Sequence, residues 1–160
     1  MPLFRLTTDH AGFVESGVSI TVSSRDSQNR PLLGRCVGCV VADDRQQITI
    51  FLSRRKYPRV LDAIRRSGAI AVSFSEPSSH KTLQLKSTSA KLVELKSGDR
   101  DRAAGHILLL AADLERIFHR GALARAILDC SPDDLVAVAF GPVAAFSQTP
   151  GPLAGCRIEP

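Results

Sequence analysis

The sequence predicts a mainly β, α+β protein in which a small antiparallel barrel carries flanking helices. Short segments that alternate apolar and polar residues recur along the chain, as in strands with one face in water. Several of these segments are separated by only a few polar residues, which favours antiparallel hairpins. A doubly wound parallel sheet would need a helix between nearly every pair of strands, whereas helical periodicity is found in only a few stretches.

The first three predicted strands lie in the first third of the chain. Residues 18–23 alternate apolar side chains with Ser and Thr, and polar residues 25–31 then turn the chain. Residues 34–42 are apolar with little alternation, which is typical of a strand covered on both faces. Residues 47–53 alternate again, so the second and third strands are expected to form a hairpin.

The periodicity changes to that of a helix after the third strand. From Tyr57 to Ile64 the apolar residues follow the i, i+3, i+4, i+7 spacing. Pro58 suits the first turn of this helix and Gly68 suits its end. A fourth alternating strand is predicted over residues 70–74.

The remaining elements are one long strand, two helical pieces and a last strand. Residues 81–95 alternate over a length that suggests a strand crossing a barrel corner, with a bend at residues 87–89, so that it serves two halves of the sheet. Residues 97–118 carry a helical apolar stripe, and 122–128 form a weaker helical piece. The last strand is expected over residues 135–140.

Length and composition indicate one soluble domain. The 160 residues, 44% hydrophobic and 23% charged, can bury roughly two thirds of the surface that the unfolded chain exposes. We expect a single domain over residues 1–160, with 1–15 and 149–160 as peripheral arms. The first ten residues lack the pattern of a secretory signal, and no apolar run approaches the roughly 18 residues of a membrane span. A cytoplasmic protein without membrane contact is therefore expected.

The strongest local signal for chemistry is the segment from Thr49 to Lys56, which leads directly into the first predicted long helix. A helix N-terminus offers unpaired backbone N–H groups and a partial positive charge, so Ser53 and the three cations after it predict a phosphate site. The net charge of +5 also favours an anionic partner. A solvated basic turn would give the same local pattern.

Five segments of the chain carry a family resemblance: Gly34–Cys39, Thr49–Arg54, Ile70–Phe74, Pro77–Lys86 and Gln148–Pro152. In this order they resemble the pyridoxamine 5'-phosphate oxidase-like family of FMN-binding split β-barrels. The resemblance covers about residues 17–152. It implies an antiparallel split barrel of about six strands with flanking helices, and FMN as the cofactor.

The resemblance also implies a set of cofactor contacts. In that family the third strand passes the edge of the flavin ring, and the turn into the first helix binds the phosphate. The implied residues are Phe51, Leu52 and Ser53 beside the ring; Arg54, Arg55 and Lys56 as phosphate ligands; Arg35 as a further member of the phosphate shell; and Lys81, Thr82 and Gln84, which would reach the ring or the phosphate from the long strand.

Members of the family resemble one another in forming homodimers with sites at the interface, which would explain why the second strand is apolar on both faces. The implied activity is that of an FMN-dependent oxidoreductase on an unidentified small molecule, in which the flavin does the redox chemistry, so no catalytic residue is assigned. This chain has no Trp. The oxidase after which the family is named has a longer chain with a Trp-containing final strand, and this chain does not resemble it in that respect. Vitamin B6 oxidation is therefore not implied.

Other interpretations remain open beside this one. A non-catalytic binding or storage protein of the same fold, using flavin, a deazaflavin or haem, is the alternative; haem would need an axial ligand from among His10, His80, His106 and His119. The histidines show no spacing that converges on a metal, so no metal site is predicted. A nucleic-acid-binding regulator could use the basic residues 54–59, but most aromatic residues lie in apolar stripes, so nucleic acid is not the expected partner.

The Cys36-x-x-Cys39 pair invites a metal or redox interpretation. A zinc ribbon needs two such pairs on tight turns, and a redox motif lies at a helix start. Residues three apart on a strand are expected to point to opposite faces. Buried thiols with a structural role are therefore the expected outcome.

Overall fold

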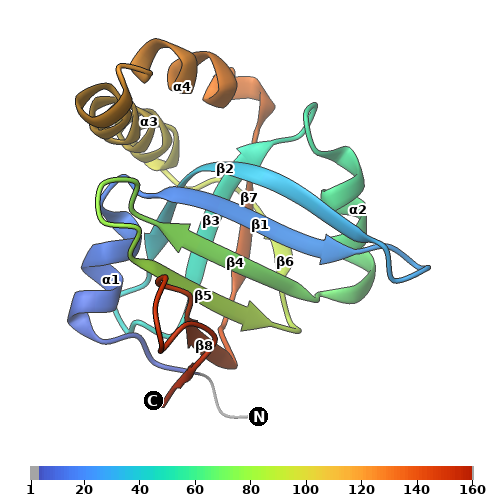
Figure 1. Cartoon of the computed structure of the whole chain (residues 1–160). Coiled ribbons are helices and arrows are strands. Elements are labelled where there is room, and N and C mark those ends of the chain that lie inside the picture. The colour runs from blue at the N-terminus through green and yellow to red at the C-terminus, as the bar shows by residue number, and fades with distance from the viewer. Residues whose placement is uncertain (1–3, 160) are drawn as a thin grey trace.

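A computed structural model describes residues 4–159 and shows one antiparallel sheet curled around an apolar core, with helices outside it (Figure 1). Its elements, in chain order, are α1 (Thr8–Glu15), β1 (Ser19–Arg25), β2 (Pro31–Val41), β3 (Ile48–Ser53), α2 (Pro58–Ser67), β4 (Ile70–Ser75), β5 (Thr82–Ser87), β6 (Lys91–Val93), α3 (Asp99–Phe118), α4 (Gly121–Leu128), the 3-10 helix η1 (Pro132–Asp134), β7 (Leu135–Phe140), β8 (Ala144–Ser147) and β9 (Arg157–Ile158).

The strands of these residues follow the order β6-β7-β3-β2-β1-β4-β5-β8-β9, and every pairing is antiparallel. The expected antiparallel barrel with flanking helices is confirmed, with nine strands in the described part of the chain instead of about six. The sheet is open, because β6 and β9 are its two edges. The hairpin predicted from the second and third strands is β2–β3.

The long alternating segment 81–95 divides into two strands that lie in different parts of the sheet. β5 pairs with β4 and β8, whereas β6 pairs with β7 near the opposite edge. Between them the amide of Ala90 donates to the carbonyl of Gly68 at the end of α2. The expectation that this segment serves two halves of the sheet is confirmed.

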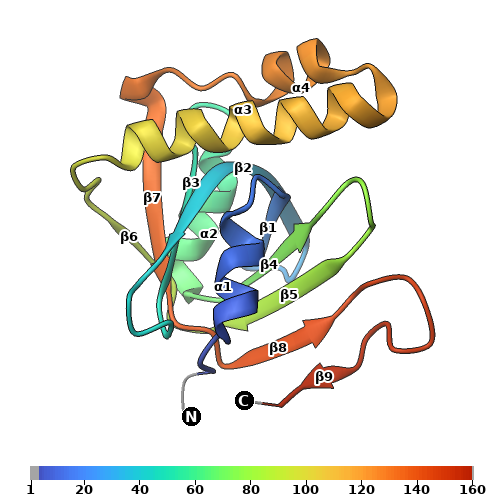
Figure 2. The same cartoon turned by 90° about the vertical axis from the view of Figure 1, so that its left-hand side faces the viewer.

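The two ends of the chain contribute more regular structure than their sequences indicated. Residues 1–15 were expected to form a peripheral arm, but this part of the chain contains the helix α1. Phe4 and Leu6, before the helix, and Val14, within it, are buried in the barrel core. At the other end, β8 and β9 form a hairpin at the margin of the sheet (Figure 2). The tail 149–155 between them has no helix or strand, as expected.

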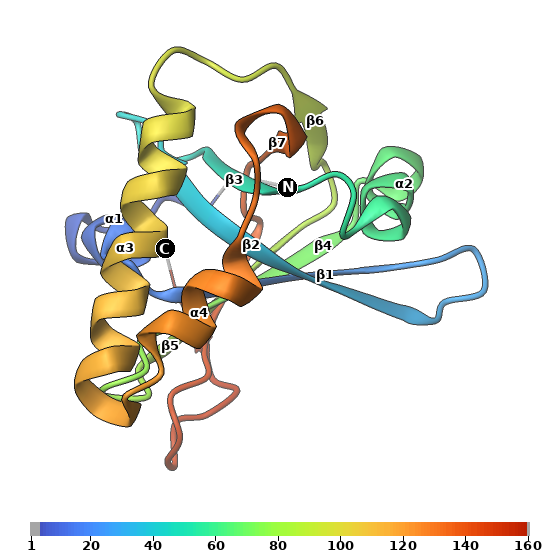
Figure 3. The ribbon, with the colours of Figure 1, turned by 90° about the horizontal axis from the view of Figure 1, so that it is seen from above.

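Helices cover the sheet from two sides. α2 packs Val60, Leu61 and Ile64 into the barrel core, while α3 and α4 lie side by side on the other side of the molecule, across β2 (Figure 3). A second apolar cluster, which includes Val37 and Phe51, fills the space between α3 and the sheet. α3 of the same chain thus covers the outer face of β2 around Val37, whereas Leu33 on this face is 65% exposed.

Two contacts fix α3 close to the sheet. A Cβ atom on Gly38 of β2 would lie only 3.2 Å from the Cα of Ala103, so glycine permits the close approach. The Nε2 of the buried His106 lies 2.7 Å from the carbonyl oxygen of Val18, just before β1. Burial lowers the pKa of His106, which favours its neutral form.

A bulge in β2 changes the orientation of two cysteines. The register with β3 shifts between Cys36 and Gly38, so that Cys36 lies opposite Leu52 and Cys39 opposite Ile50. Both thiols therefore face the barrel core, and the expectation that they point to opposite faces is wrong. Their burial is confirmed, and it raises the pKa of each thiol.

None of the helices within residues 4–159 combines the length and apolar character that a membrane crossing requires.

Candidate functional site

The turn from β3 into α2 is closed by hydrogen bonds within the chain. Each backbone amide of residues 54–57 has an acceptor: Arg54 N donates to Asp134 O (2.9 Å), Arg55 N to Asp134 Oδ1 (2.8 Å), Lys56 N to Ser53 Oγ (3.0 Å) and Tyr57 N to Ser53 O (3.3 Å). The expectation of free amide hydrogens is therefore wrong for residues 54–57, whereas the amides of Arg59 and Val60, in the first turn of α2, have no acceptor within residues 4–159. The sequence could not show the acceptors, because Ser53 and Asp134 are 81 residues apart.

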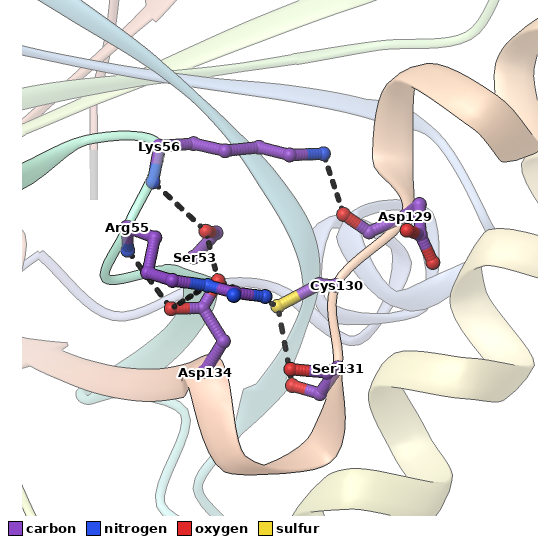
Figure 4. Close-up of polar contacts among 7 residues, drawn as sticks. All are labelled: Ser53, Arg55, Lys56, Asp129, Cys130, Ser131 and Asp134. Atoms are coloured by element: carbon purple, nitrogen blue, oxygen red, sulfur yellow. Dashed lines mark hydrogen bonds and ion pairs between the residues drawn. The ribbon is translucent and has the colours of Figure 1, made fainter.

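The carboxylate of Asp134, at the end of η1, is the anion at this corner (Figure 4). Its Oδ2 accepts a hydrogen bond from the Ser53 hydroxyl, and its Oδ1 accepts from the Arg55 amide and lies 3.6 Å from Arg55 Nε. The side chain of Asp134 is only 6% exposed. The hydrogen bond from Ser53 is the main cause that lowers the pKa of Asp134, so the group is a carboxylate at neutral pH.

The side chains of the three cations at the corner remain at the surface. The Arg55 side chain is 78% exposed despite its ion pair with Asp134. Lys56 extends to the end of α4, where its Nζ donates to the carbonyl oxygens of Ile127, at 3.0 Å, and Asp129. Carbonyls at a helix C-terminus carry partial negative charge, which accounts for the attraction.

An apolar hollow of about 250 Å³ lies where the outer face of β1 and β2 meets α3 and α4. The guanidinium of Arg35 is its charged group, and Arg35 Nη1 donates to Ser19 Oγ at 3.0 Å. The hollow thus combines apolar walls with one fixed cation. Its lining residues are Ser19, Arg35, Pro77, Leu110, Leu114, Ala124, Ile127 and Leu128.

The turn of residues 53–57, with its three cations, is called the basic corner below. A second hollow, of about 350 Å³, lies between this corner and the start of β2. It is lined by Leu32 and Leu33 of β2 and by residues 55–60. Leu33 and Arg35 are two residues apart on one strand and so share its outer face, which makes the two hollows neighbours along β2. Lys56 also lines the second hollow and contacts Ile127 of the first.

The residues predicted to lie beside a flavin ring are buried. Phe51 and Leu52 are each 0% exposed and Ser53 is 1% exposed. Their strand, β3, is paired on both sides, with β2 and with β7. In this structure these side chains offer no accessible surface, and their contact with a cofactor stays a prediction.

Gln84, one of the three residues predicted from the long strand, lies on the same sheet face as Arg35. Cross-strand register connects Arg35 to Thr21, Thr21 to Ser73 and Ser73 to Gln84. With strands about 4.8 Å apart, Gln84 lies roughly 14 Å from Arg35 along this row. Gln84 Nε2 donates to Ser73 Oγ at 3.3 Å.

The other two residues from this strand already have partners nearby. Thr82 shares a 2.6 Å hydrogen bond with Ser75. The ammonium of Lys81 lies 4.6 Å from the ring centroid of Phe13, so it faces α1. The structure therefore brings Arg35, Arg55 and Lys56 to the two hollows on β2, with Gln84 and Thr82 farther along the sheet.

Comparison with known proteins identifies the fold. No protein-family model and no curated protein matches the chain. Among solved structures, HupZ of Group A Streptococcus matches with a TM-score of 0.57 and 13% identity over 94% of this chain and 100% of that one. A putative pyridoxamine 5'-phosphate oxidase from Lactobacillus delbrueckii matches with a TM-score of 0.54 and 13% identity, over 89% and 93%.

Three further matches, each with a TM-score of 0.50, have names that mention a cofactor. HutZ, the haem storage protein of Vibrio cholerae, is 16% identical over 90% of this chain and 95% of that one. An F420 reductase and an FMN-binding protein of Nostoc punctiforme related to pyridoxamine 5'-phosphate oxidase are 11% and 14% identical. The chain thus has the split-barrel fold of pyridoxamine 5'-phosphate oxidase-like proteins, a fold on which flavin, deazaflavin and haem proteins are all found.

Proposed function

We propose that this protein binds FMN on the outer face of β2, with the ring in the apolar hollow beside Arg35 and the phosphate toward Arg55 and Lys56. One observation carries the proposal: the same strand face joins an apolar hollow that contains a guanidinium to a second hollow lined by two exposed cations. A molecule with a flat ring at one end and a phosphate at the other matches this arrangement.

The chemistry of each hollow supports its share of the cofactor. Cofactor rings bind in hollows with mostly apolar walls and a few polar groups that fix their orientation. Arg35 supplies a planar, permanently charged donor, already oriented by Ser19. Arg55 and Lys56 supply the charge-assisted hydrogen bonds that phosphate oxygens accept.

FMN, when bound, would supply hydride and electron transfer, so we propose an oxidoreductase that acts on an unidentified small molecule. The chain's own residues would bind and orient the cofactor. Leu110, Leu114 and Leu128 would exclude water from one side of the ring. A binding or storage role without turnover would use the same contacts.

The size of the ring hollow supports a homodimer. About 250 Å³ is less than the roughly 300 to 1,000 Å³ usual for enclosed ligand sites. Leu33 and Ile127, at the two hollows, are 65% and 48% exposed. A second copy of the chain would cover these apolar side chains and close the site.

The alternatives use different groups. A deazaflavin with a phosphate would suit the same two hollows. Haem would need an axial ligand, and none of the four histidines, all within residues 4–159, is among the residues that line these hollows. For nucleic acid, Arg59 and Arg65 of α2 are offset by ion pairs to Asp26 and Asp62, at 3.8 and 2.9 Å. Flavin is therefore the ligand we favour.

Titration of the purified protein with FMN and with riboflavin, followed by flavin fluorescence, tests the proposal. We expect FMN to bind at least about tenfold more tightly than riboflavin, because only FMN carries the phosphate, and a hydrogen bond to a charged group contributes about 1.5–3 kcal/mol. Equal affinities would contradict the phosphate assignment. A protein that binds neither flavin but develops a Soret band with haem would contradict the proposed function.

A further inference from the structure

The basic corner already contains an anion of its own. The Asp134 carboxylate takes the Ser53 hydroxyl, the Arg55 amide and the Arg55 guanidinium, which are the donors that this turn would otherwise direct at a phosphate. The Asp134 main-chain carbonyl takes the Arg54 amide as well. One residue thus occupies four donors of the turn.

We propose that Asp134 competes with the phosphate of the cofactor for the donors of Ser53 and Arg55. We call this carboxylate the latch. A phosphate-bearing ligand must either displace the latch or bind beside it and overcome the repulsion from its negative charge. This proposal rests on the proposed function. It assigns to Asp134, which was not among the predicted site residues, a role in lowering FMN affinity.

Charge and burial make the competition effective. The Asp134 side chain is nearly buried, so water screens its charge only weakly from a phosphate at Arg55. A dianion at that position would meet a like charge within a few ångströms and would have to share the Arg55 guanidinium with it. FMN affinity in the native protein is therefore lower than the three exposed cations alone would give.

The latch is connected to the ring hollow through α4. Lys56 follows Arg55 in the sequence and donates to the carbonyls of Ile127 and Asp129. Ile127 in turn lines the ring hollow. The segment that joins α4 to η1 spans only residues 129–131. A displacement of Asp134 would therefore be transmitted to the wall of the ring hollow.

The substitution Asp134→Asn tests the latch. Asparagine keeps the shape and an oxygen acceptor for the Arg55 amide but removes the charge. We expect FMN to bind about five- to tenfold more tightly to D134N than to the native protein in fluorescence titrations, with riboflavin affinity unchanged. Thermal unfolding measured beside the titrations establishes that the variant is folded.

Two control variants separate charge at the latch from other effects. Asp133→Asn removes one negative charge from the exposed neighbour in η1 and is expected to leave FMN affinity unchanged. Asp134→Glu keeps the charge and is expected to give no gain. If D134N does not fold, Asp134→Ser carries the same expectation, because its hydroxyl can accept from the Arg55 amide.

The outcomes distinguish the latch from the proposed function. Native protein that binds FMN, together with D134N that binds it equally or more weakly, would overturn the latch and leave the proposed function standing. FMN binding to D134N alone would support both. Failure of the native protein, D134N and D134S to bind FMN would overturn the proposed function and the latch with it.

Discussion

Replacement of Phe51 by alanine is expected to lower the free energy of unfolding by about 3–5 kcal/mol, the usual cost of removing a fully buried aromatic side chain. Phe51 is 0% exposed and lies in the cluster between α3 and the sheet, against Gly38. The large cavity left behind could not collapse easily, because β3 is paired on both sides. Urea unfolding at equilibrium, followed by far-UV circular dichroism, measures the loss.

The matched control is Phe146→Ala on β8, near the sheet margin. Phe146 is only partly buried and contacts the exposed Lys86, so its loss should cost less than half as much. This pair also tests the role that the family resemblance implies for Phe51. A variant F51A with native stability but lost FMN binding would contradict the structure and support a ring contact.

Replacement of Gly17 by alanine is expected to destabilise the protein by about 3 kcal/mol. Gly17 has φ of +83°, a region that costs an L-residue about 1–2 kcal/mol. Its added Cβ would lie 2.4 Å from the Cβ of Leu109 and 3.3 Å from the Leu109 carbonyl carbon, so α3 would have to move. Overpacking of this kind costs a further 1–3 kcal/mol or so. The same urea unfolding experiment measures the change.

The control for Gly17 lies in α3 itself. A Cβ on Gly105 would meet nothing within 4 Å, and alanine is the better helix former by about 0.5–1 kcal/mol. Gly105→Ala should therefore leave the protein unchanged or slightly more stable. Equal losses for the two variants would show that α3 does not pack against residue 17 as described.

Local periodicity was sufficient to predict most of the fold. The bounds of α2 follow from Pro58 in its first turn and from Gly68, which adopts a left-handed φ of +64° at its end. The alternation of β1 and β4 reappears as alternating burial along each strand. These features depend on neighbours within a few residues, which a single sequence contains.

Features that depend on distant contacts could not be predicted in this way. The bulge in β2 is visible only in its register with β3, and it reverses the expected orientation of Cys39. The apolar character of the outer face of β2 around Val37 is explained by α3, which begins at Asp99, far along the chain from β2. Helix α1 is short and its apolar residues form only a weak stripe, so it gave little helical signal.

The sequence was sufficient to predict the cations of the candidate site. It was not sufficient to predict that Asp134 would occupy the donors of the turn from β3 into α2. Arg35, Arg55 and Lys56 are exposed where the hollows on β2 lie. The contact of Ser53 with Asp134 could not be foreseen, because the two residues are 81 positions apart in the sequence. The apolar half of the ring hollow comes from α3 and α4, whose packing against β2 the sequence did not indicate.

The dissociation constant of FMN for the variant Arg35→Ala, measured by fluorescence titration beside Arg66→Ala, tests most directly whether the outer face of β2 is the cofactor site. Arg35 lines the ring hollow, whereas Arg66 lies on α2 and donates to the Asp62 carbonyl of its own helix. Both changes remove one positive charge. We predict FMN binding at least about tenfold weaker for R35A, the loss of one good charge-assisted contact, and unchanged for R66A. Equal affinities of R35A and the native protein would contradict the assignment of this face.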